Sequence, residues 1–222
     1  MNSDRLPHRQ IFQAIRGAFL ALLLSACGAP AAVLPSSPMT AAPSGTALIF
    51  YAQPQVSDDL WPLLFQTLRA DLAAGAGELP DGLMLDKYPT ILRGSDELRG
   101  VSFSRIITIK LLGRCDVLPR SDRSSQTGPL GWVTMVSGKI QPFVSIDCTR
   151  VAQVLHPAIA RLSRQRRQCA MAQAISHVLI HEWSHIASQS SAHSVRGLTQ
   201  ANLTAEELIS SPDGSHLSAS RR

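Results

Sequence analysis

Hydrophobic and polar positions between residues 46 and 210 predict a mixed set of strands and helices. Apolar or period-two runs predict strands at 47–52, 101–112, 130–136 and 140–148. Ser137-Gly138 predicts a hairpin turn between the last two strands, although Pro142 cannot donate to a ladder. Helical spacing of apolar residues predicts helices at 60–72, 149–162 and 170–186, and residues 78–99 predict an irregular connection. The pattern therefore predicts an α/β (α+β) domain with a small mixed sheet.

Two cysteines lie near the ends of predicted strands. If the 101–112 strand pairs antiparallel with the first hairpin strand, the second hairpin strand runs parallel to 101–112. Cys115 and Cys148 then lie at matching ends, and we expect a disulfide between them in an oxidising compartment. The alternative is a pair of reduced strand-end cysteines. Cys169 has no evident partner and is expected to remain a free thiol.

The N-terminal residues have the pattern of a targeting segment. Basic residues precede a short apolar run at 18–24, which is too brief to span a bilayer permanently. Leu24-Ser-Ala-Cys27 resembles the lipobox of bacterial lipoproteins, which implies a signal peptide at 1–26 and lipid attachment at Cys27. The alternative is an ordinary secretory signal. The composition of residues 27–45, rich in Pro, Ala and Ser, predicts a tether. We expect residues 46–210 to form the folded domain and residues 211–222 to form a disordered tail.

This resemblance implies a lipid-anchored, periplasm-facing protein of the bacterial cell envelope. The residue after Cys27 is Gly rather than Asp, which favours the outer membrane over the inner one. The formal net charge of +5 does not predict a nucleic-acid site, because the basic cluster is narrow and lacks interleaved aromatic residues. That cluster comprises Arg161, Arg164, Arg166 and Arg167. We interpret it as a solvated helix junction or a weak contact with anionic lipid headgroups.

The strongest chemical signal is His181-Glu182-Trp-Ser-His185, an H-E-x-x-H pattern inside the predicted 170–186 helix. Residues four apart lie on one helix face, so both imidazoles can reach one metal ion, and Glu182 can polarise a water beside it. The pattern arises by chance in roughly one chain in two hundred of this length. The alternative is a surface helix that carries these residues by coincidence. The apolar residues around the motif argue against this alternative, because they predict a buried helix, in which an unpaired Glu is costly.

This motif resembles the helix of the zincin metallopeptidases. The resemblance implies a zincin-like fold, in which a small mixed sheet with an antiparallel edge strand packs on the metal helix. It also implies one Zn²⁺ per chain, with His181 and His185 as ligands and Glu182 as general base and proton shuttle. The pattern H-E-x-x-H-x7-H is also similar to that of uncharacterised bacterial predicted metallopeptidases, which implies His193 as third ligand.

The third ligand departs from the established zincin patterns. Metzincins require Gly and His where this chain has Ser188 and Ser191, and there is no downstream Met for their turn. Gluzincins use a Glu from a later helix, for which Glu206 or Glu207 remains the alternative. A capping box formed by Thr204 and Glu207 gives both acids another role, in the first turn of a short helix.

Further residues are candidates for substrate contacts. The resemblance implies that strand 130–136 binds extended peptide along its edge, with Trp132 and Met135 as substrate-binding residues; the alternative is an ordinary edge strand. His177 precedes His181 by one turn and either supports the site or is a partly exposed histidine at the helix flank.

The sequence thus predicts a zinc metallopeptidase that acts on peptides or proteins and is held at the membrane by an N-terminal lipid. The alternative is a non-catalytic envelope lipoprotein with a structural metal site. A further option is a metal-binding or sensing lipoprotein. The glutamate of the motif favours catalysis, since a purely structural site has no use for it.

Overall fold

The computed structural model describes residues 45–53, 56–76, 88–94, 102–116, 128–193, 198 and 200–210. All of them belong to the unit formed by residues 41–222. The predicted signal peptide, Cys27, nearly all of the tether and the C-terminal tail lie outside the described residues. Among the residues described, no helix is long and apolar enough to cross a membrane.

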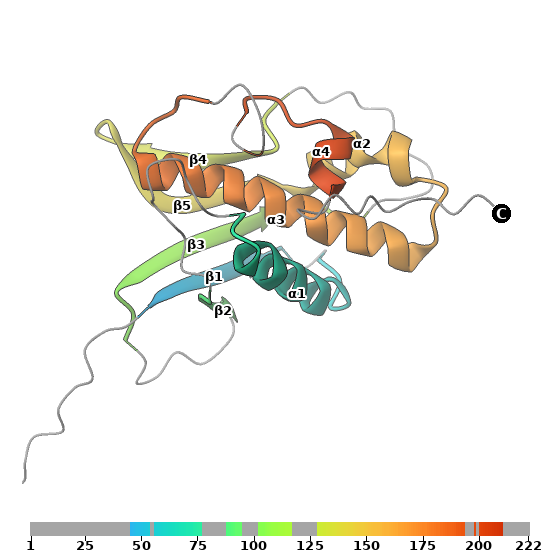
Figure 1. Ribbon diagram of the computed structural model, residues 1–222, viewed down its shortest axis with the longest axis horizontal. Coiled ribbons are helices and arrows are strands. Elements are labelled where there is room, and N and C mark those ends of the chain that lie inside the picture. The colour runs from blue at the N-terminus through green and yellow to red at the C-terminus, as the bar shows by residue number, and fades with distance from the viewer. Residues whose placement is uncertain are drawn as a thin grey trace, which may run out of the picture. The chain divides into compact units, whose positions relative to one another are not determined.

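A five-stranded mixed sheet organises this unit, which confirms the predicted α+β class (Figure 1). The strands are β1 (Thr46–Ala52), β2 (Thr90–Arg93), β3 (Arg105–Leu112), β4 (Gly131–Val136) and β5 (Lys139–Asp147), in the order β2-β1-β3-β5-β4. β1, β2, β3 and β5 run parallel, and β4 pairs antiparallel with β5 at the edge.

The sheet corrects two expectations from the sequence. β2 lies inside residues 78–99, where no strand was predicted; it has four residues, of which only Ile91 is buried, so its pattern is too short to detect. β3 pairs with the second hairpin strand rather than the first. The reason is burial, because β5 offers Ile140, Val144 and Ile146 to the core while β4 is largely exposed. Pro142 is tolerated because it lies opposite an irregularity in the β4–β5 ladder.

Four helices are described: α1 (Leu60–Ala73), α2 (Cys148–Ile159), α3 (Arg164–Ser188) and α4 (Ala205–Ile209). α3 begins six residues earlier than the apolar pattern predicts, since the Ser163 hydroxyl accepts a hydrogen bond from the Arg166 N–H and caps it. Pro157 lies in the last turn of α2. The predicted capping box of α4 is present, with the Thr204 and Glu207 side chains each bonding the other residue's backbone N–H.

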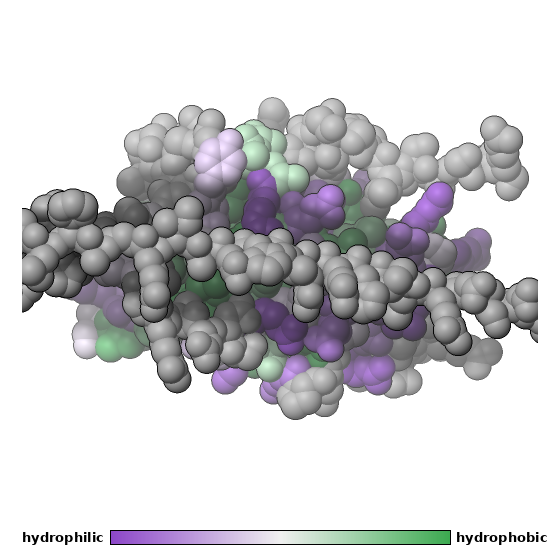
Figure 2. All heavy atoms as spheres, turned by 90° about the horizontal axis from the view of Figure 1, so that it is seen from below, coloured by the Kyte–Doolittle hydropathy of each residue, from purple (hydrophilic) through white to green (hydrophobic). Residues whose placement is uncertain are grey.

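Helix α3 is the centre of the core. It contacts α1, α2, α4, β4 and β5, and all residues from 170 to 186 except Gln173 are buried (Figure 1). Apolar side chains from alternate positions of β1 and β3 pack with it in one cluster that includes Phe50 and Ile109. On the face seen in Figure 2, hydrophilic residues prevail among the described residues that are visible, with a few hydrophobic ones between them. A helix buried on nearly every side must satisfy its polar side chains internally, and among the described residues of α3 only Trp183 Nε1 is buried without a hydrogen-bond partner.

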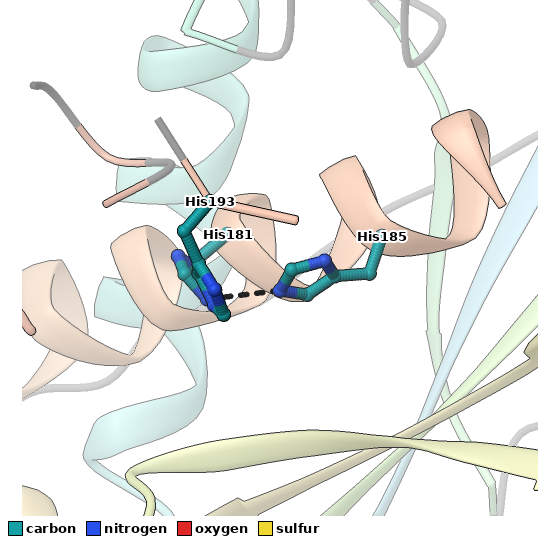
Figure 3. Close-up of side chains that lie close together, drawn as sticks. All are labelled: His181, His185 and His193. Carbon is teal, nitrogen blue, oxygen red and sulfur yellow. Dashed lines mark hydrogen bonds between the residues drawn. The ribbon is translucent and has the colours of Figure 1, made fainter. Parts of the chain in front are cut away.

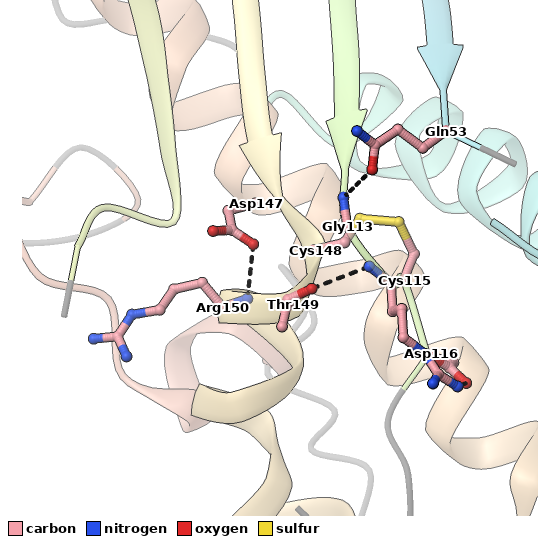
Figure 4. Close-up of a disulfide and its surroundings, with 9 residues drawn as sticks. Gln53, Gly113, Cys115, Asp116, Asp147, Cys148, Thr149 and Arg150 are labelled. Atoms are coloured by element: carbon pink, nitrogen blue, oxygen red, sulfur yellow. Dashed lines mark hydrogen bonds and ion pairs between the residues drawn. A yellow bond between two sulfur atoms is a disulfide. The ribbon is translucent and has the colours of Figure 1, made fainter. Parts of the chain in front are cut away.

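A disulfide joins the carboxyl ends of two neighbouring parallel strands. Cys115 follows β3 and Cys148 begins α2 directly after β5, the pairing expected from the sequence (Figure 4). Next to it the Arg114 N–H donates to the Thr149 hydroxyl at 3.0 Å. The Gly113 N–H donates to Gln53 Oε1 at 2.9 Å, which ties the end of β1 to the same place.

We expect Cys115→Ala combined with Cys148→Ala to lower the free energy of unfolding. The bond links residues 33 positions apart, and the entropy it removes from the unfolded chain corresponds to roughly 3–4 kcal/mol. Urea unfolding of oxidised protein measures the difference, with Cys169→Ala as control because this half-buried thiol is unpaired. Equal midpoints for the double variant and the control would contradict the expectation.

Candidate metal centre

Three histidines converge at the C-terminal half of α3. His181 and His185 lie on one face of the helix, and His193 returns to them after the helix ends at Ser188 (Figure 3). Gln189 makes that return possible: its backbone is left-handed (φ 51°), and its side chain binds the backbone N–H and C=O of Ile140 on β5. One nitrogen from each imidazole lies within 4.8 Å of the others.

Backbone carbonyls fix the orientation of the two helical imidazoles. His181 Nδ1 lies 2.7 Å from the Leu198 carbonyl oxygen, and His185 Nδ1 lies 2.7 Å from that of Ser190. Both Nδ1 atoms therefore carry the proton and donate it, as metal-binding histidines usually do. The lone pairs on Nε2 then face each other at 3.2 Å with no proton between them, and a cation bound by both nitrogens would remove this repulsion.

The donor set fits a metal ion. Two nitrogens on a tetrahedral zinc lie about 3.3–3.4 Å apart when each is 2.0–2.1 Å from the metal, close to the observed separation. Burial is the main cause that lowers the pKa of His181, and burial also lowers the pKa of His193. Both shifts favour neutral imidazole, the form that binds metals. The histidine cluster is therefore compatible with a metal site, without indicating which metal.

Glu182 follows His181 on α3 and lies beneath the edge strand β4. Its side chain is 4% exposed, and burial raises its pKa to about 7. It faces Gly131 at the beginning of β4, where an added Cβ would lie 3.0 Å from Glu182 Oε1 and 2.7 Å from Val178 Cγ1. The absence of a side chain at Gly131 therefore lets β4 approach both residues of α3.

We expect Gly131→Ala to destabilise the protein and to displace the Glu182 carboxylate. The Val178 contact is too short for a real Cβ, and overpacking of this kind costs about 1–3 kcal/mol. Thermal unfolding and metal content measure the effect, and Thr134→Ala, at an exposed position of the same strand, is the control. A variant that is as stable as wild type would mean that β4 shifts freely on α3.

A cleft of about 440 Å³ runs between β4 and the histidine cluster. Its lining includes His181, Glu182, His185 and His193 together with Trp132 and Met135. Met135 pairs with Ile140, on the face of the sheet that packs on α3. Trp132 pairs with Ser145, so strand alternation directs its side chain to the other face, and it reaches the cleft from the rim.

The strand pairing also determines which backbone groups of β4 face the cleft. The Asp147 N–H donates to the Leu130 carbonyl at 2.9 Å, so Gly131 and Val133 occupy non-hydrogen-bonded positions opposite Ile146 and Val144. Their N–H and C=O groups therefore point away from β5, toward the free edge. Neither the importance of these groups nor that of Gly131 was recognised in the sequence, although a glycine inside a strand can signal a close approach of backbone.

Comparison of the chain with models of known protein families, with curated proteins and with solved structures found no match. The interpretation of the site therefore depends on its own residues. The geometry assembles the histidines that the sequence singled out, and it adds two anchors that no sequence pattern reveals. These are the carbonyl groups of Ser190 and Leu198, which any residue type would supply.

His177 differs from the expectation of a partly exposed residue. Its side chain is 2% exposed, and Nε2 lies 3.8 Å from Asp71 Oδ2 on α1. The Ser176 hydroxyl donates to the same carboxylate oxygen at 2.6 Å, and His177 Nδ1 lies 3.1 Å from the Glu207 carbonyl oxygen. Burial is the main cause that raises the pKa of Asp71 and lowers the pKa of His177. This network, which the sequence did not reveal, joins α1, α3 and α4.

The two alternative acidic ligands lie elsewhere. Glu207 is held by Thr204 and Gln200, and its hydrogen bonds to Thr204 lower its pKa. Glu206 is exposed in the first turn of α4. Neither belongs to the group of side chains that can share a metal within the described residues, so the structure favours His193.

Proposed function

We propose that this protein is a zinc-dependent hydrolase of peptide bonds. The observation that carries the proposal is the placement of Glu182 beside a three-histidine cluster, at the base of a cleft bounded by the free edge of β4. The H-E-x-x-H resemblance to zincins supports the same function. The metal is proposed as zinc because three neutral imidazoles are typical of catalytic zinc sites, which keep one position open.

The chain's own residues supply the remaining chemistry. A zinc ion held by His181, His185 and His193 would polarise the carbonyl to be cleaved and lower the pKa of a nearby water. Glu182 accepts the proton of the attacking water and returns it to the leaving amine. Without metal, burial raises the pKa of this carboxylate to about 7, and a bound cation would lower that pKa, which favours the ionised form that accepts the proton.

The edge of β4 is proposed as the place where the substrate binds. Gly131 and Val133 have backbone donors and acceptors that face the cleft, and an extended peptide can pair with them as an added strand. Met135 offers apolar contact farther along the strand and Trp132 at the rim. Each contact recognises backbone or apolar groups, which suits a peptide or protein substrate.

The envelope is proposed as the location, with Cys27 as the lipid-bearing residue. A buried disulfide between Cys115 and Cys148 is typical of proteins that fold in oxidising compartments such as the bacterial periplasm. Labelling cells with a fatty-acid probe tests the lipid directly. Wild type should carry the label, and Cys27→Ala should lose it.

A second candidate is a non-catalytic lipoprotein with a structural metal. It is favoured by the position of His193, which is exposed and lies just after the end of α3, so that a metal would tie this segment to the helix. This role predicts a protein that unfolds when the metal is removed but cuts no peptide. The catalytic proposal differs because it requires the zinc-loaded protein to hydrolyse peptide bonds.

The proposed function is tested with full-length protein purified in detergent and loaded with zinc. We expect hydrolysis of peptides in a mixed library, loss of hydrolysis with a chelator, and recovery when zinc is added back. Mass spectrometry of the products identifies the cleaved bonds. A folded, zinc-loaded protein that cuts nothing in the library would favour the structural-metal alternative.

A further inference from the structure

One end of the cleft carries a cation that the proposed reaction does not use. Arg150 lies in the first turn of α2, where its backbone N–H is capped by Asp147 Oδ1 at 3.0 Å. Its half-buried side chain lines the cleft together with Gly128 and Pro129, which lead into β4. Figure 4 shows this side chain extending away from the disulfide.

Two of its three guanidinium nitrogens are fixed by neighbours. Nε donates to the Gly128 carbonyl oxygen at 3.3 Å, and Nη1 donates to Gln153 Oε1 at 3.4 Å. Within the described part of the chain, Nη2 has no hydrogen-bond partner, and no carboxylate pairs with the side chain. Arg150 is thus a positioned cation with a donor to spare.

The surroundings make this cation the distinctive charge of the cleft. Among the described residues that line the cleft, Glu182 is the only Asp or Glu and Arg150 is the only Lys or Arg. Apolar side chains of Leu130, Val154 and Leu203 line the cleft as well. A guanidinium held in such a setting favours an anion, because Nη2 can donate a charge-assisted hydrogen bond to it and the two neighbours already fix the rotamer.

We propose that Arg150 binds a carboxylate of the substrate, on the C-terminal side of the cleaved bond. This inference rests on the proposed peptidase function. β4 runs from Gly131 to Val136, and Gly128 precedes it. A peptide that adds antiparallel to β4 therefore directs its C-terminal residues toward Gly128 and Arg150. The carboxylate is either the free C-terminus or the side chain of Asp or Glu.

Matched peptides distinguish these sources. Three peptides share one cleavable sequence and differ beyond the cleaved bond: one has Gln and a C-terminal amide, one has Gln and a free C-terminus, and one has Glu and an amide. We expect kcat/KM of wild type to be roughly tenfold to hundredfold higher for one carboxylate peptide than for the amide with Gln. The preferred peptide identifies the source.

Variants assign the preference to the guanidinium. Arg150→Gln should bring the ratio of kcat/KM between the preferred carboxylate peptide and the amide peptide close to one, and Arg150→Lys should keep part of the preference. Arg166→Gln, which removes the same charge from an exposed position of α3, should keep all of it. An Arg150→Gln variant that slows all three peptides equally would mean that Arg150 only supports the chain before β4, and the proposal would be wrong.

Binding separates this inference from the proposed function. The same peptides are titrated into zinc-loaded Glu182→Gln protein by calorimetry, with and without Arg150→Gln. If wild type cuts nothing but the carboxylate peptide still binds through Arg150, the hydrolase proposal fails and the carboxylate site stands. Equal binding of acid and amide peptides would overturn the carboxylate site.

Discussion

Glu182→Gln is expected to lower peptide hydrolysis by about 10²- to 10⁴-fold, the usual contribution of a general acid–base group. Glutamine has nearly the same shape, so it fits beside Gly131, but it cannot accept a proton from the attacking water. The carboxylate lies outside the set of side chains that can share a metal, so zinc content should stay at the wild-type level. The measurement is kcat on a cleaved peptide, with elemental analysis of the same sample.

The matched control is Glu206→Gln, because it makes the same chemical change at an exposed position of α4. It should retain wild-type activity and metal. A Glu182→Gln protein that holds zinc and keeps full activity would rule out the proposed role of this residue. Loss of metal in that variant would instead show that Glu182 supports the metal centre itself.

The second large effect is expected from His193→Ala. Removing one of the three proposed ligands should weaken zinc binding by roughly hundredfold or more. Mutation of a residue that only hydrogen-bonds a metal ligand already lowers metal affinity by about 10- to 100-fold. His193 is exposed, so its replacement leaves the core intact and the fold should persist. Competition with a chromogenic chelator gives the affinity, and circular dichroism checks the fold.

Two controls make this result specific. His156→Ala removes an imidazole from α2, which is not part of the histidine cluster, and should leave zinc binding unchanged. The double variant Glu206→Ala with Glu207→Ala removes the acidic alternatives and should also retain zinc, although loss of the capping box costs α4 about 1 kcal/mol. Zinc lost in the acidic double variant but kept in His193→Ala would reverse the ligand assignment.

The chain positions its candidate centre by burying the helix that carries it. α3 contacts three helices and two strands, so a rotation of this helix would disrupt many contacts at once. The network of Asp71, Ser176 and His177 adds a polar connection to α1 one turn before His181. Gln189 fixes the other end of the helix to β5. Both ends of the segment that carries His181 and His185 are therefore restrained by contacts within the chain.

Features that depend on neighbours along the chain could be predicted from the amino-acid sequence. The spacing of His181 and His185 places both on one face of any helix, and the short segment after Ser188 limits how far His193 can lie from them. The capping box at Thr204 and Glu207 is local for the same reason. The positions of Cys115 and Cys148 at the ends of predicted strands led to the expected disulfide, which is present although the 101–112 strand was paired with the wrong strand of the hairpin.

Features that join distant segments of the chain could not be predicted in this way and follow from the three-dimensional fold. The Leu198 and Ser190 carbonyls that orient the imidazoles carry no sequence signal, since every residue has a carbonyl. Asp71 reaches His177 across 106 positions of the chain, and the position of β4 at the sheet edge follows from competition between strands for burial. Arg150 and Gly131 border the same cleft because α2 and β4 each pack beside it. Such contacts depend on the path of the folded chain, which no local pattern records.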